Sequence, residues 1–216
     1  MKTTCPSIPL SQHQLVPVIV MDREDDGKPL AEALIQGGLP VAEVTMRTPA
    51  ALGAMKQISE FSEILLGAGT VVTADQVDMA VDAGCSYIIC PGIHESVIER
   101  CLELDVLCIP GVITPSDIAK AMSYGLDLVK FFPAEAFGGA KTLKAMAAPY
   151  GNMKFVPTGG INASNVMSYL ELPFVAACGG SWMVDRNLIK DGNFQQVTNL
   201  ISEAVNLVGT CGSGSR

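Results

Sequence analysis

Short apolar runs alternate with segments of helical periodicity along this chain of 216 residues. Most of the runs are continuously apolar, which is typical of strands that are covered on both faces. The predicted strands are Leu15–Val20, Val41–Thr45, Ile64–Ala68, Tyr87–Cys90, Val106–Ile109, Leu128–Phe132, Lys154–Pro157 and Phe174–Cys178. They begin roughly 20–26 residues apart, so each gap holds one helix and two short loops. The pattern predicts an α/β protein with eight βα units.

Eight such units favour a single (β/α)8 TIM barrel over residues 1–208. An open, doubly wound sheet is the alternative, but such a sheet often carries a nucleotide fingerprint, and no GxGxxG follows the first strand. In a barrel, function gathers where the strands end. The ends of the predicted strands are therefore the places to search for chemistry.

Several helix boundaries are marked by capping signals. Thr73 with Gln76 forms a capping box before an apolar helical pattern. Thr114 before Pro115 combines a cap with a proline at the first helical position. Asn162 is expected to cap the helix through Val166 and Leu170.

The two ends of the chain are predicted to differ in order. Residues Cys5–Gln14 are expected to form a short N-terminal helix at the bottom of the barrel, without the apolar stretch of a signal peptide. Asn193–Val208 has the apolar spacing of a closing helix, and the tail Gly209–Arg216 is expected to be disordered.

Composition excludes several classes of function. The formal net charge is -8, which argues against binding nucleic acid or anionic membranes. No apolar run approaches the length of a membrane span. The seven cysteines are odd in number and lack a CxxC, so we expect reduced thiols in a cytoplasmic protein, several of them small core residues.

Lys130 is the most informative single residue. It lies near the end of the predicted strand in the stretch LDLVKFFPAEA. A buried lysine is costly unless it is neutral, paired or used for chemistry, and a neutral amine is a nucleophile toward carbonyl carbon. The alternative is a lysine whose stem lies in the core while its charged end reaches water or a carboxylate.

The end of the second predicted strand adds polar groups. Glu43, Thr45 and Arg47 alternate, so their side chains point the same way, and Glu43 and Arg47 are compatible with either a structural ion pair or a catalytic role. A hydroxyl, Thr70, follows the third strand.

Two glycine pairs follow the last two predicted strands. Gly159-Gly160 comes after Thr158, and Gly179-Gly180 comes before Ser181. Each pair alone more often makes a turn. Together, in consecutive final units, they indicate an anion site built from backbone N–H groups.

A metal centre is not indicated. The chain has two histidines, His13 and His94, and no HxH, HExxH or clustered-acid pattern. A lysine, a carboxylate and an anion site instead suggest imine chemistry on a phosphorylated carbonyl compound.

The segments EVTMRT, GAGTV, CPG, IPGVITPSD, VKFFPAE, PTGGI and GGSW occur in this order. Together they resemble the 2-keto-3-deoxy-6-phosphogluconate (KDPG) and 4-hydroxy-2-oxoglutarate (KHG) aldolase family, over nearly the whole chain. The resemblance implies a homotrimeric (β/α)8 barrel of the Schiff-base type, without a cofactor or metal. It also implies cleavage of KDPG to pyruvate and glyceraldehyde 3-phosphate in the Entner–Doudoroff catabolism of sugar acids, and cleavage of KHG to pyruvate and glyoxylate.

The resemblance assigns roles to individual residues. Lys130 is implied to form the imine, and Glu43 to act as the general base and then as an acid. The implied substrate contacts are a carboxylate site at Arg47 and Thr70, a pyruvyl site at Pro91 and Phe132, a hydroxyl contact at Thr158, and a phosphate site at Gly159, Gly160, Gly180 and Ser181. Thr158 also favours the gluconate-derived substrate, because a sister family for the galactonate-derived epimer tends to carry valine there.

Two other functions remain compatible with the residues. A phosphosugar isomerase or epimerase would share the phosphate site without needing an imine. A non-catalytic phosphometabolite-binding protein would bind a ligand without turnover. The sequence does not rank KDPG against KHG as substrates.

Overall fold

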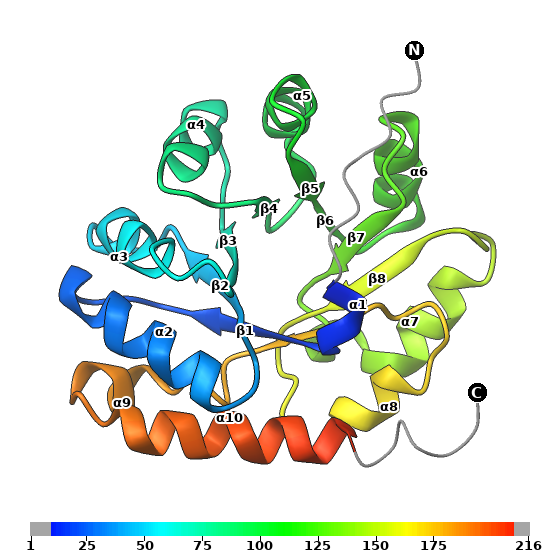
Figure 1. Cartoon of the computed structure of the whole chain (residues 1–216). Helices are drawn as coiled ribbons and strands as arrows, with labels where there is room; N and C mark the ends of the chain where they lie inside the picture. Colours follow the sequence, from blue (N-terminus) through cyan, green and yellow to red (C-terminus); the bar gives the residue numbers. More distant parts are fainter. Residues whose placement is uncertain (1–9, 210–216) are drawn as a thin grey trace.

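The structure, a computed structural model, describes residues 10–209 and shows an α/β fold with parallel strands (Figure 1). The strands are β1 (Leu15–Ile19), β2 (Val41–Thr45), β3 (Leu65–Gly69), β4 (Tyr87–Ile89), β5 (Leu107–Ile109), β6 (Gly111–Val112), β7 (Leu128–Phe131), β8 (Lys154–Pro157) and β9 (Cys178–Gly180). One sheet has the order β5-β4-β3-β2-β1-β9, and the other has the order β6-β7-β8. Every named pair is parallel, as the repeated βα units predict.

The two sheets are linked at both junctions, so the strands curl around a common centre. At one junction, Pro110 alone separates β5 from β6, and its carbonyl accepts a hydrogen bond from the Lys130 N–H at 2.9 Å. At the other junction, isolated parallel bridges join Phe155 to Val175 and Thr158 to Gly179.

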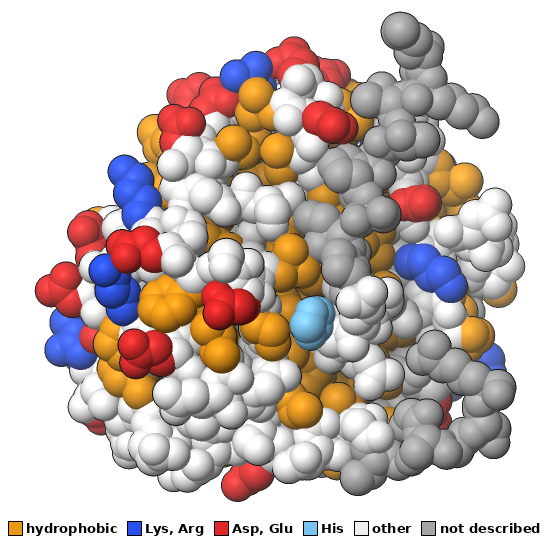
Figure 2. All heavy atoms as spheres, viewed as in Figure 1, with side chains coloured by type: hydrophobic (Ala, Val, Ile, Leu, Met, Phe, Trp, Pro, Cys, Tyr) orange, Lys and Arg blue, Asp and Glu red, His pale blue; other side chains and the backbone are white. Residues whose placement is uncertain are grey.

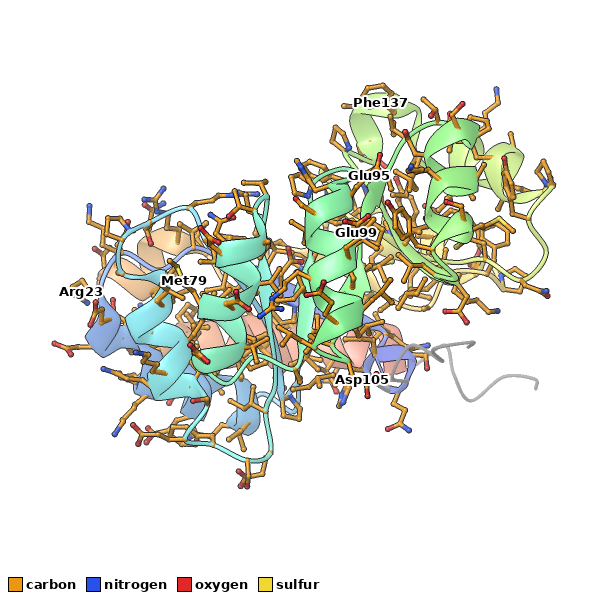
Figure 3. The ribbon with its side chains drawn as sticks, turned by 90° about the horizontal axis from the view of Figure 1, so that it is seen from above. Arg23, Met79, Glu95, Glu99, Asp105 and Phe137 are labelled. Carbon is orange, nitrogen blue, oxygen red and sulfur yellow. The ribbon has the colours of Figure 1, made fainter. Side chains whose placement is uncertain are left out.

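The helices lie around the outside of the curled strands, except for α1, which lies across their middle (Figure 1). They are α1 (Leu10–His13), α2 (Gly27–Gln36), α3 (Ala51–Ile58), α4 (Ala74–Asp82), α5 (Glu95–Glu103), α6 (Pro115–Ser123), α7 (Gly139–Ala147), α8 (Val166–Leu170), α9 (Arg186–Lys190) and α10 (Phe194–Gly209), with the 3₁₀ turns η1 (Glu24–Asp26) and η2 (Glu135–Phe137). The long helix α10 packs against α2 and α9. Tyr124, just after α6, donates its hydroxyl hydrogen to Glu95 (2.7 Å) and Glu99 (3.2 Å) of α5. Both glutamates are labelled on α5 in Figure 3.

Two of the predicted caps are confirmed and one is wrong. Thr73 accepts a hydrogen bond from the Gln76 N–H, but the Gln76 side chain accepts the N–H of Val72 rather than that of Thr73, so only half of the predicted capping box forms. Thr114 forms a full capping box. The Asn162 side chain instead accepts hydrogen bonds from the N–H and hydroxyl of Ser164. Its carboxamide oxygen is therefore used in a turn, and the helix begins only at Val166, with Asn165 at the N-cap position.

The last strand also differs from its prediction. The apolar pattern placed it at Phe174–Cys178, whereas β9 spans Cys178–Gly180. The reason is a change of partner along this segment. Ala176 donates its N–H to Phe155 of β8, whereas Cys178 donates its N–H to Gln14 just before β1. The predicted strand is therefore divided between two neighbours. The third strand starts at Leu65, one residue later than predicted.

The predictions for the chain ends are tested only in part. The helix α1 covers four residues of the predicted Cys5–Gln14 helix, and the residues before Leu10 lie outside the described range. The closing helix is confirmed as α10. This helix also includes Gly209, which was predicted to be the first residue of a disordered tail, and residues 210–216 lie outside the described range. Among residues 10–209, no helix has the length and apolar character needed to cross a membrane.

The core is apolar with few exceptions, and the exceptions locate the site. Glu43 of β2 and Lys130 of β7 are 1% and 4% exposed, respectively. The other buried charged residue, Asp26, is paired with Arg23 at 2.8 Å. Five cysteines are free and buried, which confirms the core role predicted for several cysteines: Cys85, Cys90, Cys101, Cys108 and Cys178.

Figure 2 shows the charged side chains on one face of the molecule. Acidic side chains are intermixed with fewer basic ones, and the described residues on this face form no basic patch.

Candidate active site

The structure joins Lys130 and Glu43 in a buried pair. The Nζ atom of Lys130 lies 3.0 Å from Oε1 of Glu43. Lys130 lies on β7 between partners on β6 and β8, and Glu43 on β2 between partners on β1 and β3. The sequence left open an ion pair between Glu43 and Arg47. Among the described residues, Glu43 pairs with Lys130 instead.

The second oxygen of the Glu43 carboxylate has no partner. Oε2 is buried and accepts no hydrogen bond from the described residues. Leaving a buried acceptor unpaired costs about 1–3 kcal/mol, and more for a charged group. A hydroxyl of water or substrate would satisfy this oxygen. The carboxylate is therefore arranged to accept a proton from a group that enters the site.

A glycine on β3 leaves room for Glu43, and a tyrosine on β4 holds the backbone of the preceding residue. On β3, a Cβ at Gly69 would lie 2.3 Å from Oε1, so only glycine leaves room for the carboxylate. On β4, the Tyr87 hydroxyl donates to the Ala42 carbonyl at 2.8 Å. Burial, and secondarily the charge of Glu43, raises the pKa of Tyr87 well above its usual value. The phenol therefore remains protonated and keeps this hydrogen bond.

A pocket of about 150 Å³ opens beside this pair. Its walls are formed by Val18, Arg47, Lys130, Phe132, Thr158, Gly159, Gly160, Ile161, Gly180 and Ser181. Eight of these ten residues are site residues predicted from the sequence. Val18 and Ile161 were missed, because a valine within an apolar strand and an isoleucine after a glycine pair carry no signal of their own.

The predicted residues that do not line the pocket lie around it. Thr70 has a left-handed φ of 60° and accepts a hydrogen bond from Nε of Arg47 at 3.0 Å. The Pro91 carbonyl contacts the backbone of Gly111, where a Cβ would lie 2.2 Å from it. Pro91 is thus near the site through its backbone, but it is not part of the pocket wall.

Phe132 contributes an aromatic face next to the amine. The Nζ atom of Lys130 lies 5.1 Å from the centroid of the Phe132 ring, within the range of a cation–π contact. The amine therefore contacts both an aromatic ring and a carboxylate. Lys130 and Phe132 both line the pocket, which is where a carbonyl compound would reach the amine.

The glycines after β8 and in β9 are required by the backbone. Gly159 and Gly160 have φ of 100° and 81°, a region that side-chain-bearing residues rarely adopt. A Cβ at Gly179 would lie 2.3 Å from Oγ1 of Thr158. The missing side chains keep bare backbone exposed along this wall of the pocket.

Residues 10–209 include no group of three or more His, Cys, Asp or Glu side chains arranged to hold a metal ion. His13 ends α1, and His94 precedes α5. Neither histidine belongs to the wall of the pocket.

The model of one protein family, KDPG and KHG aldolase, matches residues 8–200. The chain belongs to this family. A 2-dehydro-3-deoxy-phosphogluconate aldolase from Treponema pallidum is 43% identical over 201 residues, which cover 93% of this chain and 96% of the relative.

Solved structures agree with this assignment. The KDPG aldolase of Legionella pneumophila, with pyruvate captured as a covalent carbinolamine, is 40% identical with a TM-score of 0.87, covering 91% of this chain and 98% of that one. The KDPG aldolase of Zymomonas mobilis with 3-phosphoglycerate is 38% identical with a TM-score of 0.85, covering 91% and 92%. This chain thus shares its fold with aldolases that hold a pyruvyl adduct in one case and a phosphorylated acid in the other.

Proposed function

We propose that this protein is a class I aldolase that cleaves KDPG to pyruvate and glyceraldehyde 3-phosphate. The observation that carries the proposal is the buried Lys130–Glu43 pair beside a pocket, with one carboxylate oxygen left without a donor. Replacing a whole buried ion pair by well-packed apolar residues is often neutral or stabilising, by about 1–4 kcal/mol. The presence of the pair is therefore better explained by chemistry than by stability.

The first step is formation of the imine. Glu43 takes a proton from the Lys130 ammonium across the 3.0 Å contact, which frees the amine lone pair. Nζ attacks the C2 carbonyl carbon, and the carbinolamine hydroxyl leaves as water with the proton returned by Glu43. The product is an iminium ion on Lys130 beside an ionised Glu43.

Cleavage follows from the same pair of groups. Glu43 takes the proton of the C4 hydroxyl, the C3–C4 bond breaks, and its electrons neutralise the iminium to give an enamine. Glyceraldehyde 3-phosphate leaves. Glu43 then returns its proton to C3, and water hydrolyses the restored iminium to pyruvate and the Lys130 ammonium, which restores the starting ion pair with Glu43.

The pocket supports a defined substrate orientation. We propose that Arg47 and Thr70 hold the substrate carboxylate, because a guanidinium matches a carboxylate in a bidentate contact. In the same proposal Phe132 and Pro91 pack against the pyruvyl part, and Thr158 contacts a hydroxyl. The phosphate is bound by the remaining group of wall residues, Gly159, Gly160, Gly180 and Ser181.

A second substrate is supported by the family match. The matching family includes KHG aldolases, and KHG shares the 2-keto acid end that Lys130 and Arg47 would hold. An isomerase, an epimerase or a non-catalytic binding protein would need the phosphate wall but not a buried lysine beside an unpaired carboxylate oxygen.

We also propose that the strands close into one (β/α)8 domain spanning residues 1–208, with β5 and β6 as a single strand. The links through Pro110 and Thr158 support this closure. The family resemblance supports a homotrimer, and the free buried thiols support a cytoplasmic location. Light scattering coupled to size-exclusion chromatography would test the trimer.

Borohydride reduction in the presence of pyruvate, followed by intact mass and peptide mapping, tests the function. We expect a reduced pyruvyl adduct on Lys130. Lys130→Arg keeps a positive charge opposite Glu43 but is expected to give no adduct. Lys144→Ala, which removes an exposed lysine of α7, is the matched control and should label fully. A folded wild-type protein without an adduct would exclude imine chemistry.

A further inference from the structure

The turn between β8 and α8 (Figure 1) contains two asparagines. Their side chains form a bracket around the carbonyl oxygen of Gly160, because both donate a hydrogen bond to it. Nδ2 of Asn165 lies 3.1 Å from this oxygen, and Nδ2 of Asn162 lies 3.3 Å from it. Oδ1 of Asn165 also accepts the N–H of Asn162 at 2.8 Å. The Asn165 carboxamide therefore binds the turn at two points, and its rotation is fixed by both.

This bracket determines the direction of the next backbone donor. Among the described residues the only cis peptide bond is Phe132–Pro133, so the Gly160–Ile161 peptide is trans. In a trans peptide the N–H points opposite to the carbonyl. Gly160 and Ile161 line the pocket, whereas the asparagines do not. Holding the Gly160 carbonyl toward the asparagines thus directs the Ile161 N–H toward the pocket.

Two donors of this turn are free. Among residues 10–209, the N–H groups of Gly160 and Ile161 have no recorded acceptor within the protein, whereas Gly159 adjoins the Thr158–Gly179 bridge. A buried N–H without a partner is costly, and Ile161 is only 5% exposed. The turn therefore presents donors that an anion in the pocket would satisfy.

Positively charged side chains contribute little to phosphate binding at this end of the pocket. The two cations of the pocket wall, Lys130 and Arg47, belong to the imine and carboxylate positions of the proposed function. The first basic residue after β9 is Arg186, and both ends of its guanidinium bind Asp22, at 2.6 and 2.8 Å. Neutral N–H donors have to bind the phosphate largely through their direction, which makes the asparagine bracket important.

We infer that Asn165, assisted by Asn162, is a positioning residue that orients the Gly160–Ile161 peptide for the substrate phosphate. This inference rests on the proposed aldolase function. It concerns only the phosphate end of the substrate. In the described part of the chain, no hydrogen bond joins either asparagine to Lys130 or Glu43. Its loss should affect phosphorylated substrates selectively.

The test compares KDPG with unphosphorylated 2-keto-3-deoxygluconate. For Asn165→Ala we expect KM for KDPG to rise about tenfold, the effect of one well-placed hydrogen bond to a charged group. We expect kcat/KM for the unphosphorylated compound to change by less than about twofold, since the bracket acts only on the phosphate donors. Inorganic phosphate, used as an inhibitor of the unphosphorylated reaction, should bind about tenfold more weakly for the same reason.

Asn165→Asp is a sharper variant, because it keeps Oδ1 for Asn162 and replaces the amide donor with a second oxygen. We expect it to weaken KDPG and phosphate binding at least as much as Asn165→Ala. Asn152→Ala is the matched control, since this exposed asparagine lies at the opposite end of β8. Its kinetic constants should equal those of the wild type.

Equal losses with both substrates, or an unchanged KM for KDPG, would overturn the inference. If Asn165→Ala does not fold, Asn162→Ala carries the test, and it must show the same selectivity in a smaller degree. A wild-type protein that forms no Lys130 adduct would instead remove the aldolase proposal itself. If the wild type is active and Asn165→Ala leaves the KM for KDPG unchanged, only the role of the asparagine bracket is excluded.

Discussion

Nζ of Lys130 lies 3.0 Å from Oε1 of Glu43, although 87 residues separate them in the sequence. The pair is buried, and Oε2 of Glu43 has no donor among the described residues. One carboxylate can therefore exchange a proton with the lysine through one oxygen and with a substrate hydroxyl through the other. This relationship accounts for a nucleophile and a base that act on the same substrate at one edge of the pocket.

Glu43→Gln should separate imine formation from cleavage. The amide keeps the size of the side chain but cannot take the C4 hydroxyl proton, so we expect cleavage to fall about 10²–10⁴-fold. Some borohydride-trapped pyruvate adduct should remain on Lys130. Glu203→Gln, an exposed change on α10, is the control for loss of a carboxylate. Steady-state turnover and adduct mass measure the two steps, and near-normal turnover would remove Glu43 from the mechanism.

Gly69→Ala should disturb the site through Glu43 alone. The added Cβ would lie 2.3 Å from Oε1, so the carboxylate has to move away from Lys130. We expect kcat to fall at least about tenfold and unfolding free energy to fall by about 1–3 kcal/mol. Gly151→Ala is the control, because no atom lies within 4 Å of its added Cβ. Kinetics and urea unfolding measure both effects, and unchanged kinetics would show that the position of the carboxylate does not matter.

Thr158→Val should alter selection between the C4 epimers of the substrate. Valine keeps the shape next to Gly179 but removes the hydroxyl that lines the pocket. We expect the ratio of kcat/KM for the gluconate-derived and galactonate-derived compounds to fall about tenfold, as one hydrogen bond to substrate is lost. Ratios equal to the wild type would contradict the role of Thr158 in substrate recognition.

Tyr169→Phe should change the pH dependence of stability. The Tyr169 hydroxyl of α8 donates a hydrogen bond to Glu135, just after the strand of Lys130. Burial, and then the bond to Glu135, raises the pKa of Tyr169. A raised pKa means that the contribution is complete below the usual tyrosine pKa of about 10 and disappears as pH rises through the folded-state value.

We therefore expect Tyr169→Phe to lower unfolding free energy by about 1 kcal/mol at pH 7–9, with a smaller difference from wild type above about pH 10. Urea unfolding across this range measures the difference. Tyr150→Phe, which removes a hydroxyl bound to the Pro115 carbonyl, is the comparison variant. A difference that grows with rising pH would contradict the assigned direction.

Much of the fold was evident from local patterns. Continuous apolar runs, glycine after helices and the caps at Thr73 and Thr114 predict the order of elements, because burial and capping depend on residues close in sequence. The cap at Asn162 failed for a related reason. Several nearby groups compete for one carboxamide oxygen, and Ser164 wins in the folded turn.

Residue types along the chain indicate which positions are buried and which need glycine, as in the apolar run around Lys130 and the glycines after the last predicted strands. The contacts between these residues are set by the three-dimensional fold. It paired Glu43 with Lys130 instead of Arg47, divided the last strand between β8 and β1, and brought Val18 and Ile161 into the pocket wall. A side-chain period reports the face on which a residue lies, whereas its partner depends on strand register across the sheet, which is set by contacts between segments far apart in the chain.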